Sequence, residues 1–169
     1  MITISKENKN NISEIANVTH AAFGQKTEAA IIESLRRDGA LTVSLVAEEG
    51  GKIVGHIAFS PVTLEMVDQK IEALGLGPMA VLPEHQRRQI GTQLIYEGLK
   101  ACRKINAGLV FVLGHPEYYP RFGFVPTFPY NIAWEVECPK EAFMVLELKE
   151  AALEGLSGVV KYHPAFMAP

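Results

Sequence analysis

The sequence of 169 residues has little of what marks several specialised classes of protein. Its two cysteines, Cys102 and Cys138, lie far apart and show no C-x-x-C spacing, so we expect neither a disulfide framework nor a metal site. The apolar run LVFVL, residues 109–113, is far too short to span a bilayer. The N-terminal MITISKENKN also lacks the apolar core of a signal peptide. We therefore expect a cytoplasmic protein with no membrane partner.

The chain also lacks a strong charge of either sign. Lys and Arg number 16 and Asp and Glu number 19, which gives a net charge of −3 and no global field for nucleic acid. The hydrophobic fraction of 48% and charged fraction of 21% are those of an ordinary globular protein. We expect one domain over residues 1–169, with a core of about 2–150 and a segment 151–169 that completes the sheet with a strand.

The spacing of apolar residues changes along the chain. Three- and four-residue spacing predicts helices in NISEIANVTHAAF, in TEAAIIESLRR with Thr27 as its N-cap, and in GTQLIYEGLKACRKIN, where Gly98 is unfavourable. Strands are expected in TVSLVA, KIVGHIAFSPVTLE, IEALGLGPMAV, AGLVFVLG, AFMVLELK and GVVKYH, the first two joined as a hairpin by EEGG. This order predicts an α/β (α+β) fold with a mixed, mostly antiparallel sheet and a right-handed β–α–β crossover over residues 71–113.

The stretch PEHQRRQIGTQL, residues 83–94, lies between a predicted strand and a helix start. A helix start leaves backbone N–H groups without intrahelical partners and carries partial positive charge. Arg87 and Arg88 add formal charge, and the Thr92 hydroxyl can donate a hydrogen bond, so the stretch is typical of an anion site. The alternative is a solvated basic turn. It is neither a Walker A loop nor a Rossmann fingerprint.

The strand before this stretch has an irregular composition. Gly75, Gly77 and Pro78 weaken strand pairing and predict a bulge or a splay from the neighbouring strand LVFVL. The backbone groups of Met79 and Val81 would then lack a strand partner and could bond an extended ligand. The alternative is that Gly-Pro merely marks an edge strand.

These features together resemble the GCN5-related N-acetyltransferase (GNAT) superfamily. Residues 86–91, QRRQIG, match its Q/R-x-x-G-x-G/A motif at the first and last positions, and Gln89 departs from the middle glycine. YYPRFGF, residues 118–124, resembles the later element in which a tyrosine precedes Gly-Phe. The resemblance covers nearly the whole chain in element order. VLGHPEYYPRFGF with the closing VKYHPAF is most similar to the YhbS-like type of acetyltransferase.

The resemblance implies a transfer of the acetyl group from acetyl-CoA directly to an amine of a small molecule or a protein, by a chain that could form a homodimer. The pantetheine arm would bond the backbone of Met79 and Val81. The residues implied at the pyrophosphate are Arg87, Arg88, Gln89, Gly91 and Thr92. The alternative function is an acyl-CoA-binding regulatory module without turnover.

The resemblance also implies a tyrosine as general acid, because a neutral phenol with a pKa of about 10 can protonate the leaving thiolate. Tyr119 aligns best, with Tyr118 as the fallback, and its other interpretation is a tyrosine of the core. For the general base we expect His115, whose unperturbed pKa of about 6.5 suits neutral pH. His115 could equally be a turn histidine that caps backbone groups.

Other candidates for the base are weaker. Many family members use a glutamate on the fourth strand, but the corresponding place here is Gly75. Glu72 lies three residues earlier, where a strand shift could bring it near. His20 and Glu28, in the helices that usually border the acceptor site, and a water chain complete the list.

Overall fold

The computed structural model describes residues 1–167, and its contacts group the chain into two compact units. The first unit contains residues 1–60, 77–102 and the segment from Pro164 onward, and the second unit contains residues 61–76 and 103–163. Two long strands, β3 (Lys52–Glu65) and β4 (Lys70–Val81), each contribute one part to either unit. The expected single domain stays a prediction.

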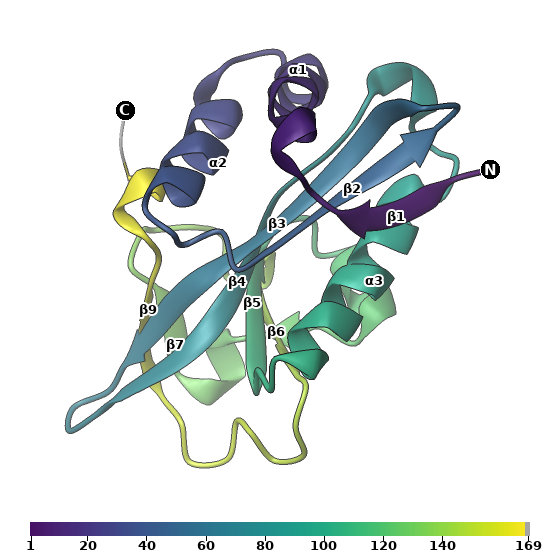
Figure 1. Ribbon diagram of the computed structural model, residues 1–169. Helices are drawn as coiled ribbons and strands as arrows, with labels where there is room; N and C mark the ends of the chain where they lie inside the picture. Colours follow the sequence, from purple (N-terminus) through teal and green to yellow (C-terminus); the bar gives the residue numbers. More distant parts are fainter. Residues whose placement is uncertain (168–169) are drawn as a thin grey trace. The chain divides into compact units, whose positions relative to one another are not determined.

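The strands of the first unit are antiparallel. β1 (Thr3–Lys6) pairs with β2 (Val43–Glu49), and β2 pairs with the first part of β3 (Figure 1). Gly50 and Gly51 form the turn between β2 and β3 with φ values of 58° and 78°, which glycine adopts at little cost. The hairpin predicted at EEGG is therefore present, whereas β1 was not expected from the sequence.

Helices cover both faces of these strands. α1 (Ile12–Phe23) and α2 (Thr27–Arg37) lie on one side of β2 and β3, and α3 (Ile90–Lys104) lies on the other (Figure 1). The prediction of Thr27 as the N-cap is wrong by one residue, because Lys26 is the N-cap and makes no side-chain cap. α1 ends at Gly24, whose φ of 70° closes the helix in the left-handed conformation.

Gly98 lies where α3 packs on β3. A Cβ atom at Gly98 would lie 2.5 Å from Cε1 of Phe59, so no larger residue fits without displacing a fully buried ring. The predicted helix included Ile105, but α3 ends at Lys104 and Ile105 is 53% exposed. The glycine that weakens the helical pattern in the sequence is thus required by packing against the sheet.

The second unit contains both parallel and antiparallel pairs. The first part of β4 runs parallel to β5 (Leu109–Leu113), which pairs antiparallel with β8 (Phe143–Glu147). β8 also pairs with the short β6 (Val125–Pro126). β9 (Gly158–Lys161) pairs antiparallel with the end of β3 and parallel with β7 (Ile132–Trp134). The mixed, mostly antiparallel sheet is confirmed.

The pairs between β4 and β5 cover three residues of each strand, from Leu74 and Val110 to Leu76 and Val112. β4 continues beyond this point, through a cis Gly77–Pro78 peptide bond, to Val81. The parallel pairing expected of the β–α–β unit is therefore present. The splay predicted for the residues that follow stays a prediction.

Apolar side chains from β3, β4, β5, β8 and β9 form the core of the second unit. Phe111 and Phe143 stack at its centre, with ring centroids 5.6 Å apart. The remaining elements are short 3₁₀ turns, which are η1 (Lys9–Asn11), η2 (Pro83–His85), η3 (Tyr119–Phe122), η4 (Phe128–Tyr130), η5 (Lys140–Ala142) and η6 (Pro164–Phe166). No helix within residues 1–167 is long and apolar enough to cross a membrane.

Candidate active site

The segment between β4 and α3, residues 82–89, is named here the charged loop. It begins with η2, continues through an extended Gln86 and enters α3 at Ile90. Arg87 and Gln89 adopt left-handed backbone conformations, with φ values of 64° and 67°. Gln89, which stands at the middle glycine of the motif, thus has a conformation that glycine adopts at little cost, and Arg87 shares it. Each left-handed non-glycine residue costs roughly 1–2 kcal/mol, so the surrounding structure must fix this loop.

The start of α3 presents backbone donors at the end of the charged loop. The helical hydrogen bonds include that from the Gln93 N–H to the Gln89 carbonyl, 3.0 Å long. The N–H groups of Ile90 and Gly91, in the preceding turn, have no acceptor one helical turn earlier within α3. Gly91 and Thr92 are half-buried there. The anion site at the start of α3 stays a prediction.

Gln86 braces the charged loop against the end of β4. Its side-chain Nε2 donates to the Val81 carbonyl over 3.0 Å, which closes the chain between these two residues. Val81 and Met79, both predicted to contact a ligand through their backbone, are half-buried. Gln86 was not among the predicted site residues, although its place at the start of the motif was a signal for it.

Glu49, at the end of β2, pairs with the charged loop. The two Arg88 nitrogens lie 3.0 and 2.6 Å from the two Glu49 carboxylate oxygens, and Nε2 of His85 lies 3.5 Å from Glu49 Oε1. The hydrogen bonds from Arg88 lower the pKa of Glu49, and those same bonds raise the pKa of Arg88. Arg87 is exposed and makes no ion pair within residues 1–167. Nothing in the sequence singled out Glu49 as a partner of this loop.

Tyr119 lies in the second unit, at the start of η3, and only 8% of it is exposed. Its ring packs edge-on against Tyr118 and Phe124, with centroids 5.2 and 5.7 Å away. Burial raises the pKa of Tyr119 to about 12, and Tyr118 contributes further. No hydrogen bond of the Tyr119 hydroxyl is found among the described residues. The phenol is therefore neutral at physiological pH and able to donate.

The turn before Tyr119 is built on His115. The His115 carbonyl accepts hydrogen bonds from the N–H groups of Tyr118 and Tyr119, 3.1 and 3.3 Å long. The His115 imidazole is exposed, so the residue fixes the turn through its backbone while its side chain stays accessible. Tyr118, the fallback acid, is half-buried, and the Arg121 guanidinium lies 4.7 Å from the centre of its ring.

Glu72 and Gly75 lie on opposite faces of β4, because they are three residues apart in a strand. Glu72 is exposed and accepts a hydrogen bond of 3.4 Å from Thr63. The place of a side chain at Gly75 is taken by Tyr162, whose Cε2 atom lies 2.9 Å from where a Cβ atom would stand. This arrangement gives no support to Glu72 as a base, and the sequence did not single out Tyr162 for the site.

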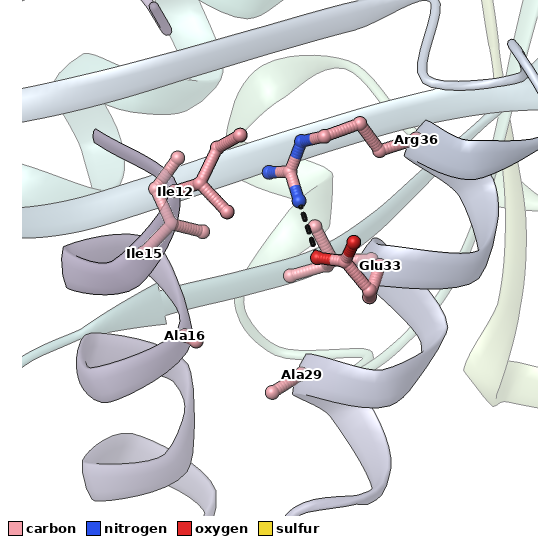
Figure 2. A pocket seen from close by; sticks show the side chains of 7 residues that line it. Ile12, Ile15, Ala16, Ala29, Glu33 and Arg36 are labelled. Atoms are coloured by element: carbon pink, nitrogen blue, oxygen red, sulfur yellow. Dashed lines mark hydrogen bonds and ion pairs between the residues drawn. The ribbon is translucent and has the colours of Figure 1, made fainter. Parts of the chain in front are cut away.

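A small pocket between α1 and α2 contains none of the predicted site residues (Figure 2). It is lined by Ile12, Ile15, Ala16, Ala29, Ile32, Glu33 and Arg36. In the same helices, His20 is exposed and the Glu28 carboxylate accepts bonds of 3.1 and 3.2 Å from Gln25. Neither residue is brought to the charged loop or to Tyr119 by any described contact. Among the described residues no cluster of His, Cys, Asp or Glu could hold a metal ion.

Comparison with known proteins places this arrangement in a family. The family model of the acetyltransferase (GNAT) domain matches residues 3–127. The chain is 35% identical over 146 residues to the uncharacterized N-acetyltransferase YhbS of Escherichia coli strain K12, covering 86% of each chain. It is also 40% identical over 121 residues to the uncharacterized N-acetyltransferase YjhQ of the same strain, covering 70% of this chain and 66% of YjhQ.

Two solved structures have the same fold and contain a CoA ligand. The E. coli YhbS crystal structure in complex with CoA has a TM-score of 0.92 at 32% identity and covers 99% of this chain and 92% of YhbS. A GNAT family acetyltransferase from Brucella melitensis in complex with acetyl-CoA has a TM-score of 0.81 at 38% identity, covering 98% of both chains.

Proposed function

The chain belongs to the GNAT family of acetyltransferases, and we propose that it transfers the acetyl group of acetyl-CoA directly to an amine of a small molecule or a protein. The observation that carries this proposal is the neutral, buried phenol of Tyr119, which has no hydrogen-bond partner among the described residues. The complexes of similar acetyltransferases with CoA and acetyl-CoA support the choice of cosubstrate.

The charged loop fits the pyrophosphate of acetyl-CoA. An anion needs donors that are not already satisfied, and the start of α3 offers the backbone N–H groups of Ile90 and Gly91 together with the exposed Arg87 guanidinium. Arg88 is held by Glu49, so it would contribute through its backbone or after leaving the carboxylate. Gln89, Gly91 and Thr92 would line the same anion, with Met79 and Val81 offering backbone groups to the pantetheine arm.

The reaction needs two proton movements. The amine nitrogen attacks the thioester carbon, so that a C–N bond forms and the C–S bond breaks, and the electron pair leaves with sulfur. Tyr119 would give its hydroxyl proton to that sulfur, a general-acid role typically worth about 10²–10⁴-fold in rate. Since burial raises the pKa of Tyr119 to about 12, the phenol keeps its proton across the working pH range.

The attacking amine must lose a proton before or after attack. The exposed imidazole of His115, four residues before Tyr119, is the base that we propose for this step. A chain of water molecules is the alternative. Glu72 is the weaker choice, because it lies on the other face of β4 from Gly75 and is bonded to Thr63.

An acyl-CoA-binding module without turnover is the second candidate function. It is favoured by Gly75, where the space of a side chain is filled by an aromatic ring and no carboxylate can stand. Such a module would bind acetyl-CoA through the charged loop and would release no CoA with any amine.

Calorimetry and a thiol assay separate these functions. We expect acetyl-CoA to bind near neutral pH and free thiol to be released with at least one amine of a panel of small amines and peptides. Tyr119→Phe should lower kcat about a hundredfold and leave the Kd of acetyl-CoA within twofold. The absence of acetyl-CoA binding would refute both functions, and binding without thiol release would favour the module.

Two further expectations belong to this proposal. We propose that the protein acts in the cytoplasm and that it forms a homodimer. Cell fractionation and sedimentation of the purified protein test these statements, and a sedimentation coefficient of a monomer would contradict the second.

A further inference from the structure

One arginine of the charged loop is already bound to a carboxylate. Glu49 is the last residue of β2, and its two carboxylate oxygens accept hydrogen bonds from the two terminal nitrogens of Arg88, over 3.0 and 2.6 Å. This two-pronged geometry is also the one in which a guanidinium binds a phosphate most strongly. The edge of Arg88 that best holds an anion is therefore used within the protein.

The backbone of the charged loop is fixed around Arg88. The residues on either side, Arg87 and Gln89, have left-handed conformations with φ values of 64° and 67°. The Gln86 side chain donates to the Val81 carbonyl over 3.0 Å and ties the loop to the end of β4. The Arg88 side chain itself is 47% exposed. Arg88 can therefore change its partner by rotation of its side chain, without a movement of the loop.

His85 gives Glu49 a second polar neighbour. Its Nε2 atom lies 3.5 Å from Oε1 of Glu49, the same oxygen that accepts a hydrogen bond from Arg88. The side chains of His85 and Glu49 are 18% and 26% exposed, so both are partly shielded from water. Glu49 keeps this neighbour when Arg88 leaves, which lowers the cost of separating the pair.

We propose that Glu49 sets the affinity of the protein for acetyl-CoA by competing with the pyrophosphate for the Arg88 guanidinium. This inference rests on the proposed function, in which the charged loop binds that pyrophosphate. While Arg88 is bound to Glu49 their charges cancel, and the binding of acetyl-CoA exchanges the carboxylate for a phosphate. The lost ion pair offsets part of the new attraction. Because CoA carries the same pyrophosphate, the competition also favours release of CoA after the transfer.

The first test removes the charge of Glu49 and keeps the size of its side chain. Glu49→Gln should tighten the binding of acetyl-CoA and of CoA about threefold in calorimetry, which is the scale of one exposed ion pair. Glu48→Gln is the matched control, because it removes the same charge from the preceding residue of β2 and no ion pair of Glu48 is found within residues 1–167. An unchanged Kd in Glu49→Gln, or an equal gain in Glu48→Gln, would overturn the proposal.

The second test asks whether Glu49 acts through Arg88. In an Arg88→Gln background there is no guanidinium to compete for, so the addition of Glu49→Gln should tighten acetyl-CoA binding by less than about 1.5-fold. This remaining gain measures the direct repulsion between the Glu49 charge and the phosphates, which solvent and salt screen. A gain of about threefold in that background would overturn the proposal, because repulsion alone would then explain the effect.

The third test identifies the phosphate. Dephospho-CoA keeps the pyrophosphate of CoA and lacks its 3′-phosphate, so Glu49→Gln should tighten the binding of both ligands about threefold. A gain with CoA that is absent with dephospho-CoA would overturn the assignment to the pyrophosphate. If neither the unmodified protein nor Glu49→Gln binds acetyl-CoA, the proposed function is refuted together with this inference. Equal binding of acetyl-CoA by the two proteins would overturn this inference alone.

Discussion

The charged loop of the first unit contrasts with two buried sites of the second unit, where the rings of Tyr119 and Tyr162 pack against Gly114 and Gly75. These two sites are called the tyrosine seats. The loop is exposed and depends on charge, on backbone donors and on two left-handed residues, Arg87 and Gln89. The tyrosine seats are buried and depend on the absence of side chains at Gly75 and Gly114. A loop of this kind tolerates changes of side chain, whereas a close-packed seat is sensitive to a single methyl group.

The largest effect is expected from Gly114→Ala. The added Cβ would overlap the Tyr119 ring, so kcat should fall about a hundredfold, as in Tyr119→Phe, while the Kd of acetyl-CoA stays within twofold. Steady-state kinetics and calorimetry measure the two quantities. The control is Gly108→Ala, whose Cβ would meet its nearest neighbours at 3.8 and 3.9 Å. An equal loss of kcat in the two variants would show that the packing of the Tyr119 ring against Gly114 does not determine kcat.

Burial can also be tested in the first unit, at His56. His56 is fully buried on β3 and its Nε2 lies 2.7 Å from the Ser44 hydroxyl, which donates to Glu7. Glu7 also pairs with Arg36 at 2.9 Å. The Ser44 hydroxyl donates its only proton to the Glu7 carboxylate, so its oxygen can only accept a hydrogen bond from His56. The neutral His56 ring therefore carries its proton on Nε2. Burial lowers the pKa of His56 to about 4, an effect that Glu7 opposes.

The sign of the pH dependence follows from this pKa. Between about pH 6.5 and 4 the unfolded chain binds a proton at His56 that the folded chain does not bind. The free energy of unfolding therefore decreases as the pH is lowered through this range, by up to about 3 kcal/mol. Chemical unfolding at pH 7, 6 and 5 measures the free energy of unfolding at each pH. His56→Asn should flatten this slope, and His20→Asn, at an exposed histidine, should not. A slope that His56→Asn leaves unchanged would assign the acid sensitivity to other groups.

A smaller effect is expected from the charge of the loop. Replacing Arg87 and Arg88 together by glutamine should weaken acetyl-CoA binding about tenfold and reduce its dependence on salt, because exposed charges act through screened attraction. The kcat at saturation should not change. Arg37→Gln, an exposed arginine of the same unit, is the control. Calorimetry at two salt concentrations measures the Kd of acetyl-CoA for each protein. If the double variant binds acetyl-CoA as tightly as the unmodified protein, backbone donors alone hold the phosphates.

The smallest effect is expected at Gln89. Its φ of 67° suits glycine, so Gln89→Gly should change the Kd of acetyl-CoA less than tenfold and raise the melting temperature slightly. The backbone N–H of residue 89 remains in place. A collapse of binding would show that the glutamine side chain is essential, and the loop would then be as sensitive to side chains as the tyrosine seats.

Much of the fold could be predicted from local patterns. The three helices, the β2–β3 hairpin and the parallel pairing of β4 with β5 follow from apolar spacing, turn glycines and chain order. The strands β1, β6 and β7 were missed, because they have four, two and three residues and carry too little periodicity. Gly98 was counted against α3 because its reason, the Phe59 ring, lies on another strand.

The candidate site divides in the same way. The sequence by itself determined the charged loop, because a loop between a strand and a helix start owes its donors and charges to consecutive residues. It also marked Tyr119 through a neighbouring Gly-Phe pair. Only the tertiary structure decided that Glu49 holds Arg88, that Gly114 makes room for Tyr119, and that Gly75 makes room for Tyr162. Glu49 is distant from Arg88 in the chain, and Gly75 is distant from Tyr162, so only the folded chain brings each pair together. Gly114 is near Tyr119 in the chain, but the ring meets the glycine only because the turn at His115 folds back.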